Sequence, residues 1–269
     1  MSWELISRSF RVLRQDPKLL VFPILSALAG LAIVALYFFS PLSGDLFRRS
    51  SERHALDATQ YVTLFLGYVA FYFAMVFFNC ALAACAQARF AGSEPSIGYG
   101  LSRAAGRIGP ILMWALLAAT IGLVLQAIEE RVGFLARIVT RIFGFAWNMA
   151  TYLVVPVLVI EDADAVASIR RSASLLRKSW GEQLTVGLAL GWSVLLFAVP
   201  GIILGAIGAA GYPVALAAGV FYLALVGAAA TAVHGIFDVA LYRYATTGEV
   251  PDGYSTAILN GAFVNLKKP

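Results

Sequence analysis

Long uncharged apolar stretches alternate with short basic or mixed-charge stretches along the 269-residue chain. The longest of these stretches without a charged residue include Leu19–Ser40, Tyr61–Ala88 and Leu184–Tyr212. Each exceeds the roughly 20 residues that a helix needs to cross a hydrocarbon core about 30 Å thick. The whole pattern predicts an all-α, polytopic transmembrane helix bundle with six spans: Leu19–Ser40, Tyr61–Ala88, Gly109–Ile128, Phe143–Ile160, Leu184–Ile207 and Tyr212–Tyr242.

Two short basic segments, Ile6–Arg14 and Ile169–Arg177, share the pattern I-x-R-S-x-x-x-L-R, and Leu101–Ile108 is a weaker third copy. Apolar residues recur at helical offsets in each copy, which predicts an amphipathic helix with arginines beside an apolar stripe. Such helices lie in the membrane interface with their basic face toward the lipid headgroups. We expect nine basic residues to bind lipid or a partner: Arg8, Arg11, Arg14, Arg103, Arg107, Arg170, Arg171, Arg177 and Lys178.

The order of interfacial helix, span, outer loop, span and acidic turn occurs three times. The end of the second span, Arg89–Tyr99, resembles Arg243–Tyr254 with one inserted residue, and Glu161 takes the comparable place after the fourth span. We therefore predict a single membrane domain over residues 1–269, with repeat units at about 1–95, 96–162 and 163–254 and a cytoplasmic tail at 255–269. Internal repeats are common in membrane bundles, so they do not select an activity.

Composition and charge add an orientation. Hydrophobic residues make up 60% of the chain and charged residues 13%, against about 45–50% and about 25% in soluble domains. With the N-terminus inside, 14 of the 20 Lys and Arg residues lie on the inner side and six on the outer side. The positive-inside rule then predicts that both termini of this multi-pass protein face the cytoplasm of the cell inner membrane.

The first apolar run and the two cysteines also have structural interpretations. Arg8, Arg11 and Arg14 precede the first apolar run, which is about twice as long as the core of a signal peptide, so we expect a retained transmembrane helix. Cys80 and Cys85 lie in one apolar run five residues apart. We interpret them as buried packing residues, because this spacing places them on different helical faces.

Small residues at a spacing of four occur twice in the fifth predicted span, as Gly187-x-x-x-Gly191 and Gly201-x-x-x-Gly205. This spacing lets helix backbones approach closely. Pro200 next to Gly201 predicts a kink or an interruption of the same span.

The run from Pro156 to Trp180, PVLVIEDADAVASIRRSASLLRKSW, joins a proline-containing span end, a glutamate and a helix that carries R-x-S. This run resembles a signature of uncharacterised bacterial six-span integral membrane proteins, and of the membrane domain attached to some glycerophosphodiester phosphodiesterases. The segment ALYRYATTGEVPDGY is more similar to the uncharacterised group. The resemblance implies a membrane module of unknown activity. The sequence contains no segment that matches the soluble phosphodiesterase domain, so that domain's chemistry is not carried over.

Two ionisable side chains lie in the otherwise apolar sixth predicted span. His234 and Asp238 are four residues apart and therefore share one face of a helix. A charge at the membrane centre is unfavourable by roughly 2.5–3.5 kcal/mol on insertion scales. One interpretation is a proton relay or cation site, and the other is a structural pair in which Asp238 satisfies a neutral histidine. Two side chains make an incomplete metal site, so we expect no metal.

Asn79, Asn148 and His234 occupy comparable places in the three predicted repeat units. Asn79 and His234 each lie 15 residues before the glutamate of their acidic turn, and Asn148 lies 13 residues before it. If the units pack around a pseudo-threefold axis, these residues and Asp238 form an intramembrane polar cluster. The cluster would supply interhelical hydrogen bonds worth about 0.6–2 kcal/mol each, or else a polar gate or substrate site.

The sequence shows no nucleophile elbow, metal-ligand cluster or phosphate-binding loop, and we expect no enzymatic activity, no cofactor and no nucleic-acid partner. Our first hypothesis is a membrane scaffold whose basic helices bind anionic lipids of the cytoplasmic leaflet, a protein partner or a second copy of the chain. The alternative is a small-solute or ion transporter or channel that uses the bundle interior. The predicted interior is almost entirely apolar, whereas a path for a polar substrate needs more polar groups.

Overall fold

The computed structural model describes residues 13–14, 16–39, 58–131, 134–176 and 183–248. These residues form helices and turns, with no strand among them, so the all-α class is confirmed. The elements are η1 (Pro17–Leu20), α2 (Val21–Phe38), α4 (Ala58–Phe90), α5 (Ile97–Ala105), α6 (Ile108–Arg131), α7 (Phe134–Thr151), α8 (Val154–Ile160), α9 (Ala165–Leu176), α10 (Gln183–Ala209) and α11 (Pro213–Thr247). The predicted helix at 3–14, apart from Leu13 and Arg14, the first outer loop and the tail at 255–269 lie outside the described residues.

Five helical segments of the described chain are long and apolar enough to cross a membrane: Pro17–Tyr37, Tyr61–Phe90, Ile108–Glu129, Arg137–Ile160 and Pro213–Thr247. These segments correspond to predicted spans one, two, three, four and six. The fifth predicted span falls on α10, whose part at Val194–Ala209 is a shorter apolar helix. The protein is therefore a helical membrane protein.

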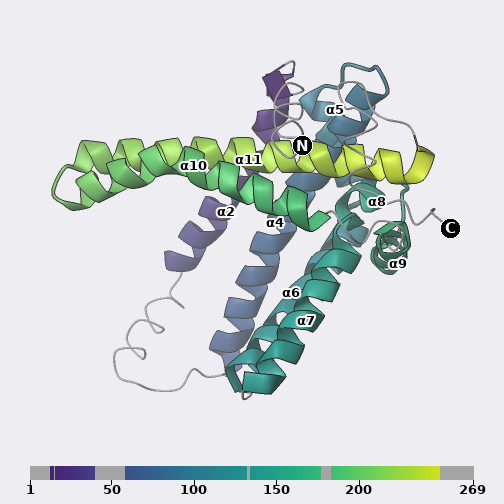
Figure 1. Ribbon diagram of the computed structural model, residues 1–269, viewed down its shortest axis with the longest axis horizontal. Helices are drawn as coiled ribbons and strands as arrows, with labels where there is room; N and C mark the ends of the chain where they lie inside the picture. Colours follow the sequence, from purple (N-terminus) through teal and green to yellow (C-terminus); the bar gives the residue numbers. More distant parts are fainter. Residues whose placement is uncertain (1–12, 15, 40–57, 132–133, 177–182, 249–269) are drawn as a thin grey trace.

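Helix α4 is the centre of the bundle. It packs against α2, α5, α6, α8 and α11. The axes of α2, α4, α6 and α7 are roughly aligned in Figure 1. A run of mostly small side chains at the C-terminal part of α4, interrupted by one leucine, is buried: Cys80, Ala81, Leu82, Ala83, Ala84, Cys85 and Ala86. Small side chains allow neighbouring backbones to come close, so several helices can meet on this one segment.

Helix α5 is seated on α4 through a glycine. A Cβ placed on Gly100 would lie 2.6 Å from the Ala81 carbonyl oxygen and 2.7 Å from Cys85 Sγ, closer than real Cβ contacts. The Ser96 side chain caps the start of α5 by accepting a hydrogen bond of 3.1 Å from the Tyr99 N–H. The close contact at Gly100 and the Ser96 cap fix the orientation of α5, and therefore the positions of Arg103 and Arg107.

The fourth predicted span is broken near its end, because α7 stops at Thr151 and α8 starts at Val154. The break frees the backbone N–H of Leu153, which donates a 3.0 Å hydrogen bond to the Ser172 hydroxyl of α9. Both residues are buried. An unpaired N–H is unfavourable in an apolar environment, and Ser172 provides its partner.

Helices α10 and α11 form a hairpin that runs across the other long helices and extends beyond them (Figure 1). Gly219 of α11 is so close to α10 that an added Cβ would lie 2.7 Å from the Gly205 N and 2.9 Å from the Gly201 carbonyl oxygen. The close packing predicted for Gly201 and Gly205 is therefore confirmed. Pro200 lies inside α10 without ending it, so the predicted interruption does not occur there.

The two halves of α11 have different surroundings. At a rise of 1.5 Å per residue, its 35 residues extend about 50 Å, which is longer than a hydrocarbon core. Val214, Val220 and Phe221 in the first half are 82%, 60% and 67% exposed, whereas Ile236 and Leu241 in the second half are fully buried. Only the second half of α11 therefore belongs to the bundle core.

Candidate functional site

An acidic turn at residues 161–164 lies where α8 ends, and it joins several helices. Helix α8 is almost completely buried. Asp162 follows it with φ of +52°, a left-handed conformation that a residue such as Asp tolerates. Asp164 then caps α9, because its carboxylate accepts a 2.8 Å hydrogen bond from the Ala167 N–H. The local chemistry of the sequence E-D-A-D thus ends one helix and starts the next.

Two predicted lipid-binding arginines, Arg103 and Arg107, hold this turn from α5 and from the α5–α6 turn. Arg103 Nη2 donates to the Val159 carbonyl at 2.8 Å and to Asp162 Oδ1 at 3.3 Å. Arg107 donates to the Leu158 carbonyl at 3.3 Å and also to the Ala163 carbonyl. The last carbonyls of a helix have no partner within the helix, and these guanidinium groups satisfy them.

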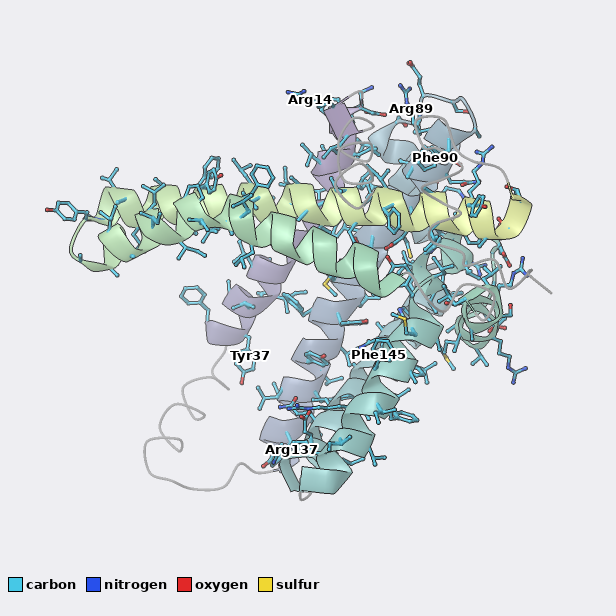
Figure 2. The ribbon with its side chains drawn as sticks, viewed as in Figure 1. Arg14, Tyr37, Arg89, Phe90, Arg137 and Phe145 are labelled. Atoms are coloured by element: carbon cyan, nitrogen blue, oxygen red, sulfur yellow. The ribbon has the colours of Figure 1, made fainter. Side chains whose placement is uncertain are left out.

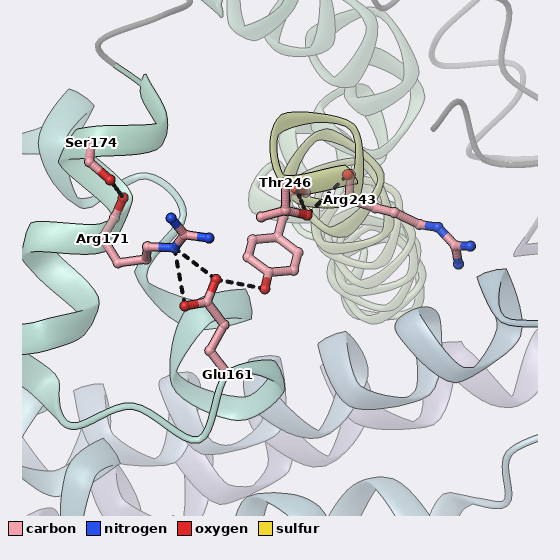
Figure 3. Close-up of polar contacts among 6 residues, drawn as sticks. Glu161, Arg171, Ser174, Arg243 and Thr246 are labelled. Carbon is pink, nitrogen blue, oxygen red and sulfur yellow. Dashed lines mark hydrogen bonds and ion pairs between the residues drawn. The ribbon is translucent and has the colours of Figure 1, made fainter. Parts of the chain in front are cut away.

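Glu161 connects the turn to α9 and α11. Arg171 Nε donates to Glu161 Oε1 and Oε2 at 2.9 and 3.1 Å, and the Tyr242 hydroxyl donates to Oε1 at 2.9 Å. Figure 3 shows Glu161 and Arg171 facing each other, with Arg243 and Thr246 on the neighbouring helix. The Tyr242 side chain is buried, and its hydrogen bond to Glu161 holds the hydroxyl group in place. The turn therefore ties together α5, α8, α9 and α11.

The nine basic residues predicted to bind lipid or a partner do not share one environment. Arg103, Arg107 and Arg171 make the internal contacts described above. Arg14 and Arg170 are exposed. The other four, Arg8, Arg11, Arg177 and Lys178, lie outside the described residues. The residues of the sequence motif R-S at positions 171–172 thus hold the fold together, because Arg171 pairs with Glu161 and Ser172 accepts from the Leu153 N–H. The similarity of this segment to an interfacial helix did not reveal that role.

Both ends of the bundle carry charge. Figure 2 shows Arg14 and Arg89 at one end and Arg137 at the opposite end. At the Arg89 end, Arg89 pairs with Glu94 at 3.6 Å. At the far end, Arg141 pairs with Glu129 at 2.9 Å. The end that carries Arg14 and Arg89 is the one predicted to face the cytoplasm.

A pocket of about 440 Å³ opens between α4, α8, α10 and α11. Among the described residues, its polar lining consists of Asn79, Thr231, His234 and Asp238. Three members of the predicted intramembrane polar cluster therefore line one pocket. Asn148, the fourth member, is exposed on α7 and is not among the lining residues. The α10–α11 hairpin crosses the other helices, so the three predicted units do not bring their polar residues to a common centre.

Asp238 has an incomplete set of partners. Its Oδ2 lies 3.7 Å from His234 Nε2, which is beyond hydrogen-bond distance. The Tyr152 ring meets the His234 ring edge-on with centroids 5.9 Å apart. Asp238 Oδ1 is buried and has no hydrogen-bond partner among the described residues. A carboxylate accepts up to about four hydrogen bonds, so this group can accept more from an occupant of the pocket.

No group of three or more His, Cys, Asp and Glu residues in the described part of the chain could hold a metal ion. Cys80 and Cys85 are both buried and unbonded to each other. The polar groups of the pocket can therefore act as hydrogen-bond donors and acceptors and as one carboxylate charge.

Comparison with known proteins gives one match. Residues 58–252 match the sequence model of a family described as "Family of unknown function (DUF6159)". No curated protein and no solved structure matched the chain. The match covers the second to sixth predicted spans, including the acidic turn and the pocket. It provides no link to the membrane domain of glycerophosphodiester phosphodiesterases, so that part of the resemblance stays a prediction.

Proposed function

The chain belongs to the family DUF6159, whose function is unknown, and we propose that it is a non-enzymatic membrane module that binds anionic lipid headgroups. The binding surface is the end of the bundle that carries Arg14, Lys18 and Arg170. The proposal places this end at the cytoplasmic leaflet of the inner membrane, in agreement with the charge asymmetry of the sequence.

The observation that carries the proposal is the exposure of basic side chains at the end of the bundle that is predicted to face the cytoplasm. Arg14 and Lys18 precede the first span and are exposed, and Arg170 is exposed on α9. Arg103 and Arg107 bind the turn that starts α9, and this contact brings α9 to the same end as α5. Basic residues at a membrane surface gain about 1 kcal/mol each from anionic lipid.

The structure divides the predicted basic surface into two sets with different roles. Arg103, Arg107 and Arg171 are engaged by protein carbonyls and carboxylates, so they are poorly available to lipid phosphates. Arg170 lies beside Arg171 on α9 and has its side chain directed to the exterior. Among the described residues, we therefore assign lipid binding to the exposed side chains of Arg14, Arg170 and, in addition to the predicted set, Lys18.

The rival function is transport of a small solute or ion through the bundle interior. The pocket lined by Asn79, His234 and Asp238 is the observation that favours this rival. Its other lining residues are apolar or glycine apart from Thr231, and Asn148 lies elsewhere. A path for a polar solute needs polar groups along its length, and this consideration favours the lipid-binding proposal.

Lipid selectivity of the purified protein tests the proposal. The protein is placed in nanodiscs of phosphatidylglycerol and phosphatidylcholine, and the lipids that remain bound are counted by native mass spectrometry. The triple variant Arg14→Gln, Lys18→Gln, Arg170→Gln is compared with the control Arg137→Gln, Arg141→Gln at the opposite end. We expect the triple variant to lose enrichment of phosphatidylglycerol, by about fivefold for each residue that contributes 1 kcal/mol, and the control to keep it.

Equal enrichment in the triple variant and the wild-type protein would contradict the proposal. A solute flux in proteoliposomes that the triple variant retains and a pocket variant abolishes would favour the rival. The two functions therefore respond to different substitutions.

A further inference from the structure

We propose that the pocket between α4, α8, α10 and α11 binds a primary alkylammonium group. The group belongs either to a free small amine or to the aminoethyl headgroup of a membrane lipid. This inference is independent of lipid binding at the basic end, because it rests on a different surface and on the opposite charge.

The first argument is the unfilled carboxylate. Asp238 Oδ1 is buried without a hydrogen-bond partner in the described part of the chain, and its residue lines the pocket. A buried polar atom without a partner is rare and unfavourable. The Asp238 side chain is 18% exposed, so a hydrogen-bond donor in the pocket can reach this incompletely satisfied carboxylate. The His234 imidazole, at 3.7 Å, does not fill this role.

The second argument is the charge of the lining. Asp238 is the one carboxylate among the described lining residues, and none of them is Lys or Arg. Asn79 and Thr231 add an amide oxygen and a hydroxyl oxygen as neutral acceptors, although the Thr231 hydroxyl itself donates to the Gly227 carbonyl at 2.9 Å. A primary ammonium group has three N–H donors and one positive charge, which matches one carboxylate and two neutral acceptors.

The third argument is the apolar remainder of the pocket. Ala83, Val155, Pro156 and Val194 contribute no charged side chain and suit a short alkyl segment. A volume of about 440 Å³ lies within the range of roughly 300–1,000 Å³ that is typical of small-molecule sites. A bare metal cation does not fit this lining, because only one carboxylate and one imidazole are at hand.

The experiment uses n-butylammonium as the probe and n-butanol as a neutral analogue of the same shape. The full-length protein is placed in phosphatidylcholine nanodiscs, and binding is measured by saturation-transfer NMR. We expect saturable binding of n-butylammonium and at least about tenfold weaker binding of n-butanol, because the charge-assisted hydrogen bond is lost. Asp238→Asn should weaken butylammonium binding by a similar factor. Glu129→Gln, which removes a carboxylate at the far end of the bundle, should not.

A second variant keeps the test valid if Asp238→Asn fails to fold. Ala230→Leu fills the pocket and leaves Asp238 in place, so it should also abolish binding, with folding checked by thermal unfolding. Absence of saturable butylammonium binding by the wild-type protein would overturn the proposal and leave water as the partner of Asp238. Equal binding by Asp238→Asn and the wild type would overturn it as well.

The source of the ammonium group is identified by a change of lipid. Phosphatidylethanolamine carries a primary ammonium group, whereas phosphatidylcholine carries a quaternary one without N–H donors. Competition of phosphatidylethanolamine with n-butylammonium, absent in Asp238→Asn, supports a lipid headgroup as the occupant. Unchanged butylammonium binding in phosphatidylethanolamine nanodiscs supports a free amine. Either result supports the site.

Discussion

The acidic turn after α8 and the carboxylate of Asp238 are two anionic sites in one small bundle, and they differ in how their oxygens are satisfied. Asp162 and Glu161 meet Arg103, Arg107 and Arg171, so the acidic turn is tied to α5, to the α5–α6 turn and to α9. Asp238 faces a pocket and keeps one buried oxygen without a partner among the described residues. The first arrangement stabilises the fold, and the second leaves binding capacity for a ligand.

The comparison also explains why residue type alone is a poor guide in this chain. A basic residue in a membrane protein is commonly assigned to the lipid surface, yet Arg107 has a side chain that is only 20% exposed and donates to backbone carbonyls. Arg170, in contrast, is exposed on α9. The partners in the fold therefore decide which arginine is structural and which can bind lipid.

The largest effect is expected from Arg107→Ala. This change removes the donor to the Leu158 and Ala163 carbonyls. Both carbonyls then lose a hydrogen bond at or just after the end of α8. We expect the free energy of unfolding to fall by about 2–3 kcal/mol. Titration with sodium dodecyl sulfate in mixed micelles measures it. A loss below about 0.5 kcal/mol would show that the turn does not depend on this arginine.

A smaller effect is expected from Glu161→Gln. The change removes the ion pair with Arg171, whose side chain is 45% exposed, and the amide can still accept from Tyr242. Solvent screening limits such a pair, so we expect a loss of about 1 kcal/mol in the same titration. Tyr242→Phe is the matched control, because it removes the other hydrogen bond of the Glu161 carboxylate. Additive losses in the double variant would mean that the two contacts are independent.

The smallest effect on stability is expected from Asp238→Asn. The amide keeps the shape of the carboxylate, and among the described residues Asp238 forms no ion pair with an arginine that the change would break. We expect the free energy of unfolding to change by about 0.5 kcal/mol or less, in contrast to Glu161→Gln. A loss of more than about 2 kcal/mol would place Asp238 with the structural carboxylates and would remove the difference between the two sites.

Much of the fold could be predicted from the sequence, because uncharged runs of sufficient length have few alternatives to a membrane helix. Five of the six predicted spans coincide with candidate membrane-crossing segments. The residues at which the helices begin and end were less predictable. The predicted outer connection Glu129–Arg141 is largely helical at the described residues, as parts of α6 and α7, since its charged residues are compatible with a helix.

The packing of the spans could not be predicted in the same way. Lipid tails are as apolar as leucine side chains, so an apolar helix face does not reveal whether it contacts lipid or protein. The crossing of the α10–α11 hairpin over the bundle is therefore not encoded in a visible pattern. Gly201 and Gly205 are an exception, because their spacing marks the close contact with Gly219. The repeat units stay a prediction.

The candidate site was partly predictable. Asn79, His234 and Asp238 stood out because polar residues are rare in membrane helices, and the pocket contains all three. Tyr152 was missed, because an aromatic residue near a span end gives no specific signal. Tyr152 lies in the break between α7 and α8, where its ring contacts His234. Besides Asp162, the structural partners of Arg103 and Arg107 are backbone carbonyls, which every sequence offers at every position.

The neighbouring residues Arg170 and Arg171 allow the most direct test of lipid binding at the basic end. Both belong to α9, but Arg171 pairs with Glu161 and Arg170 is exposed. Native mass spectrometry of Arg170→Gln and Arg171→Gln in nanodiscs of phosphatidylglycerol and phosphatidylcholine measures the lipid preference of each variant. We expect Arg170→Gln to lose enrichment of phosphatidylglycerol by about fivefold, and Arg171→Gln to keep most of it. Equal lipid enrichment in both variants and the wild type would contradict the proposed function.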